Sequence, residues 1–457
     1  MSRTRPVVVI GGGIAGLGAA FRLRRRGVPV MVFEAASTTG GRIAGAEMHG
    51  FQMDLGANIF LETYGAVREI AEELGVPLRR TRVPINGGVF FNGRLHGFYG
   101  GDRLGSRLKT LKTLLSLRLL SPRGVREALR FVRMLRARAD DLSFDDPSGA
   151  LDLDTGESIG EFFEKRIGTE CLDRFVGPTL ASYTFGRPDE VGVVYAMIAA
   201  WNFGLNGTAW PCMPERGPAV FVDALADACR EDIRLSTPVR RIEIEDGAVK
   251  GVSIDGGFVE ADAVICATTA TTALRIATGL PAEIRDVLDR VTYSKCCRVF
   301  FGLQSSPLPK DWYAACFPAA TGATMVGISN SAVLLPGTVP EGKTLLDALV
   351  MGKQAEELFA LSDAEVGGRM LSEVRRFFPA MTEEPLFTHV HRWGEAVCLA
   401  PGGVMTALQE MRQRCLGSVH GLFLAGEYMG VPSTNGALRS GMNAAADCEA
   451  FFSRPRD

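Results

Sequence analysis

The stretch Val7-Val8-Val9-Ile10-Gly11-Gly12-Gly13-Ile14-Ala15-Gly16 decides the fold of this chain. Its first four residues are β-branched and predict a short buried strand. The glycines that follow have the spacing Gly-x-Gly-x-x-Gly. Residues 17–26 have a helical composition, and residues 28–33 form a second apolar run that ends at Glu34. We therefore predict a strand–helix–strand unit with the glycines at its first turn.

The residue types in this unit suit dinucleotide binding. Gly11 permits a tight turn, Gly13 lets the backbone approach a pyrophosphate, and Gly16 lets the helix pack closely on the strand. The helix amino terminus offers N–H groups and a partial positive charge to phosphates. Glu34 can accept hydrogen bonds from an adenosine ribose, which favours FAD or NAD over NADP. This unit alone leaves FAD, NAD and a glycine-rich turn without a ligand as alternatives.

Composition narrows the class of protein. The 457 residues suffice for two or three domains, and 46% hydrophobic with 22% charged residues is typical of a folded chain. Fifty Lys and Arg against 52 Asp and Glu give a net charge of −2, which argues against a nucleic-acid partner because such proteins carry a basic footprint. The ten cysteines are scattered, so we expect reduced thiols, no metal site and a cytoplasmic location. No uncharged stretch stays apolar long enough to span a membrane.

Turn and capping signals predict further elements. Asn92-Gly93 between two strand-like runs predicts a hairpin over residues 88–97, because both central residues need positive φ. Ser121-Pro122 predicts the start of a helix through Ala139. The remaining expected elements are helices over 104–120, 158–168 and 435–452, a linker over 140–154, and strands over 234–244, 249–254, 258–267, 299–303 and 421–427.

Residues 103–138 are strongly basic, with eleven Lys or Arg and one acid, Glu127. One interpretation is an amphipathic element that faces a membrane or the substrate entrance, since basic faces with leucine stripes bind anionic surfaces. The other is a solvated helical cap over the substrate domain. Both remain open, so we expect a cytoplasmic protein with possible peripheral membrane contact.

Several motifs outside the first unit resemble the flavin amine oxidase superfamily, which includes monoamine oxidases, protoporphyrinogen oxidases and phytoene desaturases. They are Gly40-Gly41-Arg42, Asp54-Leu55-Gly56-Ala57-Asn58, Pro238-Val239-Arg240, Gly421 to Glu427, and Asn435-Gly436-Ala437. The resemblance implies FAD as the cofactor, with the arginine of the second motif pairing near it and the stretch after Asp54 passing near the flavin ring. The residues that we expect to bind FAD are Gly11, Gly13, Ile14, Ala15, Gly16, Glu34, Ala35, Gly41, Arg42, Gly56, Ala57, Asn58, Val239, Gly426, Glu427, Asn435, Gly436 and Ala437.

The resemblance also implies a fold of class α/β plus α+β, with a Rossmann-like FAD-binding domain, an inserted substrate domain and a helical cap. The FAD-binding domain is expected to be discontinuous, because its motifs lie at both ends and in the middle of the chain. The expected boundaries are 1–85, 212–280 and 415–457 for the FAD-binding domain, 86–102, 155–211 and 281–414 for the substrate domain, and 103–154 for the basic helical cap.

Within the superfamily, the chain is most similar to the protoporphyrinogen oxidase branch, on residues 158–168 and on the Asn92 to His96 hairpin. Arg392-Trp393 resembles the pair that places an aromatic ring near the flavin. The lysine that holds a water at flavin N5 in amine oxidases matches either Lys295 or Arg298. Trp393, Lys295 and Arg298 are therefore the candidate catalytic residues.

The chain also departs from its relatives. Ser433 or Thr434 stands where amine oxidases carry a tyrosine of the aromatic cage, which disfavours a small amine. The spacing from Cys398 to Pro401-Gly402 is too short for covalent attachment, so we expect non-covalent FAD. The proline and tyrosine that follow the tryptophan in protoporphyrinogen oxidases are missing from residues 394–399, which disfavours a porphyrin precursor.

We therefore expect an oxidoreductase that desaturates a bulky, largely hydrophobic small molecule by hydride transfer to flavin N5, with O2 as the acceptor. Alternatives are an amine oxidase for a secondary-metabolite amine, a redox-neutral flavin-dependent isomerase, and a non-catalytic flavin scaffold. In the dehydrogenation, the flavin is the electron sink and the protein supplies orientation and electrostatics. The oligomeric state does not follow from the sequence.

Overall fold

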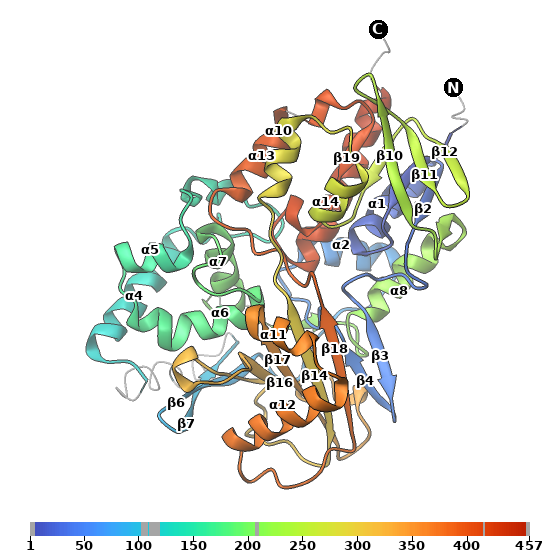
Figure 1. Cartoon of the computed structure of the whole chain (residues 1–457). Helices are drawn as coiled ribbons and strands as arrows, with labels where there is room; N and C mark the ends of the chain where they lie inside the picture. Colours follow the sequence, from blue (N-terminus) through green and yellow to red (C-terminus); the bar gives the residue numbers. More distant parts are fainter. Residues whose placement is uncertain (1–4, 102–107, 109–118, 206–209, 415, 454–457) are drawn as a thin grey trace.

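The computed structural model describes residues 5–101, 108, 119–205, 210–414 and 416–453. Its two largest sheets lie in different parts of the molecule, and helices surround both (Figure 1). The fold thus mixes helices and sheets, as the sequence predicts.

One sheet is wholly parallel and draws its strands from three distant parts of the chain. Its order is β19-β13-β1-β2-β9, and every residue of β1 is buried. The predicted strand–helix–strand unit is present, with one helix between β1 and β2. The bounds are β1 (Val7–Ile10), α1 (Ile14–Arg25), β2 (Val30–Phe33), β9 (Ile233–Arg234), β13 (Val264–Cys266) and β19 (Leu422–Leu424).

The last described helix, α14 (Thr434–Ser453), lies beside α1 (Figure 1). A Cβ on Gly441 would lie 1.9 Å from the backbone oxygen of Ala15, and one on Gly18 would lie 2.5 Å from the Leu438 side chain. Glycine at both positions therefore allows the two helices to approach closely. This contact fixes the predicted final helix against the amino-terminal unit.

A separate antiparallel sheet contains the predicted meander, but two of its predicted strands are each split. Residues 234–244 form the end of β9 and then β10, because Ser236 turns the chain with a φ of 50°. Residues 258–267 form β12 and then β13, which leaves the meander and enters the parallel sheet. The sheet has the order β10-β11-β12. Its bounds are β10 (Val239–Glu245), β11 (Ala248–Ile254) and β12 (Gly257–Glu260).

The largest sheet has seven strands in the order β18-β14-β17-β16-β15-β6-β7. The predicted hairpin is β6 with β7, and Asn92 and Gly93 have φ values of 49° and 76° at its turn. Alternate residues of β14 and β17 pack against α11 and α12, because side chains alternate between the faces of a strand. The bounds are β6 (Asn86–Phe91), β7 (Arg94–Tyr99), β14 (Cys296–Leu303), β15 (Ala314–Cys316), β16 (Gly327–Asn330), β17 (Thr344–Met351), β18 (Phe387–Trp393), α11 (Gly352–Phe359) and α12 (Asp363–Phe377).

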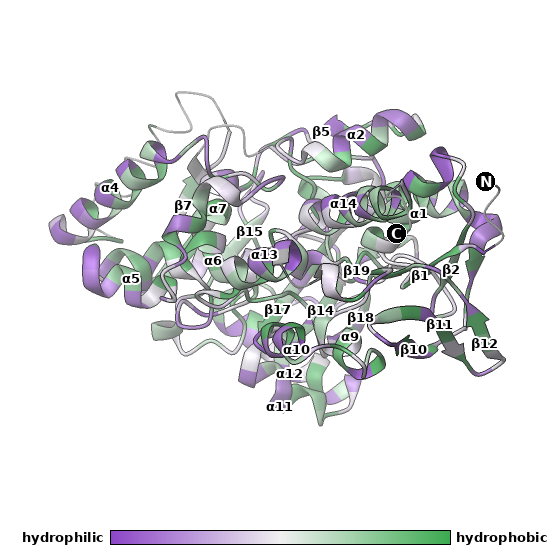
Figure 2. Ribbon diagram, turned by 90° about the horizontal axis from the view of Figure 1, so that it is seen from above, coloured by the Kyte–Doolittle hydropathy of each residue, from purple (hydrophilic) through white to green (hydrophobic). Residues whose placement is uncertain are grey.

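Two helices at one end of the molecule, α4 and α5, begin where the sequence predicts, and α6 and α7 lie beside them without having been predicted. Ser121 caps α4 by accepting a hydrogen bond from the Gly124 amide, and Ser158 forms a capping box with Glu161 at α5. Hydrophilic and hydrophobic residues alternate along α4, whose apolar side is buried (Figure 2). The helix predicted over 104–120 lies almost wholly outside the described residues. The bounds are α4 (Pro122–Ala137), α5 (Ile159–Arg166), α6 (Gly177–Thr184) and α7 (Val193–Ala200).

Shorter elements connect these layers. They are β3 (Gly45–Met48), β4 (Phe51–Asp54), α2 (Gly65–Leu74), β5 (Arg79–Arg80), β8 (Cys212–Met213), α8 (Ala219–Ala228), α9 (Ala270–Ile276), α10 (Ala282–Asp289) and α13 (Val404–Arg414). Within the described part of the chain, no helix combines the length and the apolar character that a membrane crossing requires.

Candidate functional site

A cavity of about 1070 Å³ is lined by residues from the parallel sheet, the seven-stranded sheet and the helices α6 and α14. It therefore brings together segments that are hundreds of residues apart in the sequence. The predicted site residues that line it are Gly11, Gly13, Ile14, Ala15, Glu34, Ala35, Gly41, Arg42, Gly56, Ala57, Asn58, Val239, Arg298, Trp393, Gly426, Glu427 and Ala437.

The glycines after β1 have two different structural roles. Gly11 has a φ of 104°, and a Cβ there would lie 2.7 Å from the Ala267 oxygen, while a Cβ on Gly16 would lie 1.9 Å from the Gly11 oxygen. The fold itself therefore requires glycine at 11 and 16. Gly13 has an ordinary φ of −78°, and a Cβ there would meet nothing closer than Gly41 Cα at 4.0 Å. Glycine at 13 thus leaves open space in the cavity, at the amino terminus of a helix that no side chain caps.

This open space suits a phosphate-bearing ligand. The first amides of a helix point out of its amino terminus and attract anions. Glu34 stands at the end of β2, where its carboxylate accepts hydrogen bonds from the amides of Gly12 at 2.6 Å and Ala36 at 2.7 Å. These bonds hold the carboxylate at the wall of the cavity, which Val239 also lines, and a carboxylate there could accept hydrogen bonds from an adenosine ribose.

Arg42 and Glu427, which are distant in sequence, form an ion pair at the cavity wall. Arg42 also donates to the Ala396 oxygen at 3.2 Å, and Glu427 accepts from the Cys398 amide at 3.0 Å. Burial and the neighbouring Glu427 raise the pKa of the Cys398 thiol to about 12. The thiol is therefore protonated at neutral pH, which disfavours its reaction as a nucleophile.

Trp393 and Arg298 both hold the stretch after Asp54. The Trp393 indole donates to the Leu55 oxygen at 2.7 Å, and Nη1 of Arg298 donates to the Gly56 oxygen. Arg298 is buried and paired with Asp347 on the neighbouring strand. The structure thus brings two of the three candidate catalytic residues to the same end of the cavity.

Lys295 lies outside this cavity, so the alternative that placed it at the flavin is not supported by its position. Its ammonium forms an ion pair with Glu356 of α11 at 2.7 Å, and 45% of its side chain is exposed. Lys295 immediately precedes β14, and its side chain lies on the outer face of the sheet, where Glu356 binds it. The side chain of Arg298 lies on the other face and lines the cavity.

Three predicted cofactor residues also lie outside the cavity. Gly16 supports the turn, as described above. Asn435 is fully buried and ties α14 to its surroundings, since it donates to the Phe144 oxygen and accepts from the Val67 amide, both at 3.2 Å. Gly436 lacks room for a side chain, because a Cβ would lie 2.0 Å from the Val431 oxygen. These residues shape the site without lining it.

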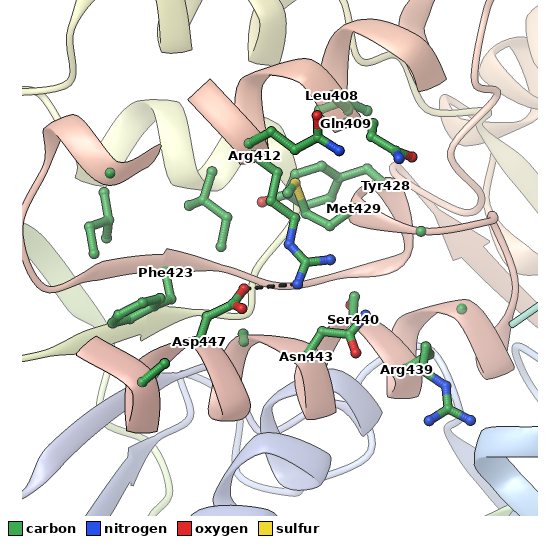
Figure 3. A pocket seen from close by; sticks show the side chains of 18 of the residues that line it. Leu408, Gln409, Arg412, Phe423, Tyr428, Met429, Arg439, Ser440, Asn443 and Asp447 are labelled. Carbon is green, nitrogen blue, oxygen red and sulfur yellow. Dashed lines mark hydrogen bonds and ion pairs between the residues drawn. The ribbon is translucent and has the colours of Figure 1, made fainter. Parts of the chain in front are cut away.

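Gly436 lines a second hollow, of about 920 Å³, between α13, β19 and α14 (Figure 3). The Arg412 guanidinium of α13 forms an ion pair with Asp447 of α14 at 2.8 Å across it, while Arg439 turns away toward Asp145. This hollow lacks the glycine turn and the candidate catalytic residues, so it is separate from the first cavity.

The sequence interpretation missed most of the aromatic residues that line the first cavity. Tyr183 and Phe203 stack with ring centroids 4.0 Å apart, and Phe98, Phe144, Phe185 and Tyr195 also line the cavity. We call the part that these six rings line the aromatic lobe. Asp347, Ser329 and Tyr313 add polar groups from the seven-stranded sheet. Asp347 had a visible signal in the sequence, because it is a single acid within the apolar run Thr344–Met351.

The described residues contain no group of three or more His, Cys, Asp or Glu side chains placed to hold a metal ion. The donor set of the cavity instead consists of backbone amides, paired carboxylates and aromatic rings. These residues fit a long ligand with phosphates near Gly13, a ribose near Glu34 and a planar ring near Gly56 and Trp393.

Comparisons with known proteins agree with this geometry. The model of a family described as flavin containing amine oxidoreductase matches residues 14–448. Mitochondrial protoporphyrinogen oxidase of Nicotiana tabacum is 24% identical over 97% of this chain and 94% of its own length. Coproporphyrinogen III oxidase of Bacillus subtilis is 22% identical over 98% of both chains. The structure of putrescine oxidase bound to putrescine superimposes with a TM-score of 0.76 at 20% identity, over 98% of this chain and 99% of that one.

Proposed function

The chain belongs to the flavin-containing amine oxidoreductases and is an FAD-dependent oxidoreductase, and from this premise we propose that it dehydrogenates a bulky, largely hydrophobic substrate at a CH–CH or CH–NH bond. One observation carries the proposal: a single cavity connects the glycine turn at Gly13 to a lobe walled by stacked aromatic rings. Bound FAD would accept a hydride from the substrate, with O2 as the proposed final acceptor.

The chain's own residues bind and orient in this proposal. Gly13 and the start of α1 would hold the phosphates of FAD, and Glu34 would hold its ribose. The Arg42–Glu427 ion pair would contact the part of FAD between the ribose and the ring. The aromatic lobe excludes water and offers flat apolar surface to the substrate. Ser433 and Thr434 line the cavity where an amine oxidase carries a tyrosine, which supports a substrate other than a small amine.

We further propose non-covalent FAD and a discontinuous Rossmann-like FAD domain. The position of Cys398 supports non-covalent binding, because this residue is fully buried and is not among those that line the cavity. The parallel sheet supports the proposed division, because it combines strands from residues 7–33, 233–266 and 422–424. Its expected partner domain contains the seven-stranded sheet and the aromatic lobe, with the basic helix α4 in the cap.

Anaerobic reduction of the flavin tests the function. The purified protein is loaded with FAD and mixed without oxygen with porphyrinogens, a carotenoid precursor and amines, while the visible flavin absorbance is followed. Bleaching by a bulky apolar compound, with hydrogen peroxide on admission of air, is the expected result. Product formation without net bleaching would replace the proposal with a redox-neutral isomerase. If dithionite reduces the flavin but none of the compounds does, the proposed reaction is contradicted.

A further inference from the structure

Arg298 and Asp347 form a buried ion pair on the floor of the cavity. They lie on β14 and β17, where Arg298 is opposite Leu349 and Asp347 is opposite Phe300, so the two side chains are diagonal neighbours on one face. Nε of Arg298 donates to Oδ2 of Asp347 at 3.2 Å. Only 3% of Arg298 and 6% of Asp347 is exposed.

A chain of hydrogen bonds fixes the Asp347 carboxylate from its other side. Ser329 Oγ donates to Asp347 Oδ2 at 3.3 Å. The Ser329 side chain is also bonded to Tyr313, whose hydroxyl accepts from Asn58 Nδ2 at 2.9 Å. The carboxylate therefore has a defined position, and through it the guanidinium has one as well.

The guanidinium is directed at the part of the cavity that we assign to the flavin ring. Nη1 of Arg298 donates to the Gly56 oxygen, next to Leu55, whose oxygen accepts from Trp393. A cation in a desolvated site stabilises a developing negative charge far more than it does in water. Two electrons and one proton convert oxidised flavin to its anionic reduced form, so a cation at this place favours reduction.

We propose that Asp347 is a positioning residue that fixes the Arg298 guanidinium beside the flavin and offsets its charge, and thereby sets the reduction potential of bound FAD. This inference rests on the proposed placement of the flavin ring near Gly56. It assigns a role in the reaction to a residue that contacts the cofactor only through Arg298.

The midpoint potential of the flavin, measured by anaerobic reduction against a reference dye, tests the proposal. In D347N the uncompensated cation should favour the anionic reduced form, and we expect the equilibrium constant for two-electron reduction to rise about tenfold, or about 30 mV. R298Q should shift the potential in the opposite direction. In the R298Q background, D347N should have little further effect, because the carboxylate acts through the guanidinium.

The matched control is E356Q. This change removes the same charge from an ion pair with Lys295, which immediately precedes β14, but the pair is exposed and lies outside the cavity. We expect an unchanged potential. All variants are compared at one and the same pH, because burial raises the pKa of Asp54 to about 7 and a change in its ionisation next to Arg298 would add a second charge.

The outcomes separate this inference from the function on which it rests. An unshifted potential in D347N, with FAD bound normally, would overturn the role of Asp347 and leave the oxidoreductase proposal intact. If D347N does not fold, R298Q decides: a lowered potential supports the pair, and an unchanged one contradicts it. A wild-type protein whose FAD is not reduced by substrate, yet whose variants shift as expected, would instead contradict the proposed reaction alone.

Discussion

Gly13 is a residue beside which the protein leaves open space in the cavity, and we assign this space to the ligand. We predict that G13A folds with unchanged thermal stability, because its Cβ would meet no protein atom closer than 4.0 Å and its φ is ordinary. The methyl group would, however, occupy the space proposed for the pyrophosphate. FAD affinity should fall at least about tenfold, or 1.4 kcal/mol, in a fluorescence titration.

The control for this prediction is G16A, the same chemical change three residues later. There the Cβ would lie 1.9 Å from the Gly11 oxygen, so the melting temperature itself should fall. An unaltered FAD affinity in folded G13A would contradict the assigned position of the phosphates.

Asp54 links stability to pH. Its pKa is raised to about 7, first by burial and further by Asp347, against the opposing effect of Arg298. In the unfolded chain the pKa is near 3.8. Between these values the folded state binds a proton that the unfolded state lacks, so this group's contribution to stability is lost as the pH rises to 7.

The free energy of unfolding of D54N, relative to that of wild type, should therefore be higher at pH 8 than at pH 5 by roughly 1–3 kcal/mol. Urea unfolding of the FAD-free protein at both pH values measures this difference. The control is D246N, in an exposed turn. An equal difference between D54N and wild type at the two pH values would show that Asp54 does not titrate in this range.

At the level of single residues, the sequence singled out the cavity-lining residues around the glycine turn better than those of the aromatic lobe. The glycines, Glu34, Arg42 and Glu427 follow short motifs in which spacing along the chain reflects spacing around the ligand. Asp347 and Tyr183 come from separate elements, and only the folded sheet brings them to one wall. For Lys295 and Arg298, the sequence could not show which side chain faces inward until the register of β14 was known.

Among the elements, helix α12 offers a test of local stability. Its capping box joins the Ser362 hydroxyl to the Glu365 amide and the Glu365 carboxylate to the Ser362 amide. We predict that S362A lowers the free energy of unfolding by about 1 kcal/mol, because an orphan helix amide loses its partner. Urea unfolding measures this change in the free energy of unfolding. The control is S372A, which makes the same substitution within the same helix but away from its cap.

The flavin should be unaffected in S362A, since α12 covers the outer face of the seven-stranded sheet. A changed flavin spectrum in S362A would contradict the placement of α12 away from the flavin. An equally large loss of unfolding free energy in S372A would contradict the role of Ser362 as a cap.

Element boundaries were predictable where a cap or a turn residue marks them. Ser121, Ser158 and Asn92-Gly93 each begin or join an element at the expected place. The split at β12/β13 was hard to predict, because apolar and acidic residues alternate without interruption from Val259 to Ala263. The split at β9/β10 did have a signal, Ser236-Thr237-Pro238, since such a cluster is typical of a turn. Which sheet a strand joins depends on long-range pairing, and local periodicity does not contain that information.

Over the whole molecule, bound FAD should connect segments that are distant in the sequence and thereby raise the free energy of unfolding. Its cavity is lined from Ile10 to Ala437, so binding should stabilise the folded state as one unit. At a free FAD concentration 100 times the dissociation constant, we expect a gain of about 2.7 kcal/mol. Thermal melts with increasing FAD measure it, and G13A should gain much less. Equal gains in both proteins would contradict the proposed site.

The family and the discontinuous use of the chain could be inferred from motifs at its two ends. The order of strands in the parallel sheet could not, because β13 and β19 are short and their pairing is long-range: Val264 of β13 lies opposite Val8 of β1, and Leu422 of β19 lies opposite Val264. No sequence motif indicated the second hollow between α13 and α14, so the sequence analysis did not predict it.

The strand order β19-β13-β1-β2-β9 has a consequence for biosynthesis. On the ribosome, β1 emerges first, yet both its neighbour β13 and the edge strand β19 are still untranslated. At roughly 5–20 residues per second, the wait from β1 until β19 and α14 have been synthesised is about 20–90 s. During that interval the nascent chain holds an unfinished sheet and an incomplete binding site, so FAD can be captured only after β19 and α14 have left the ribosome.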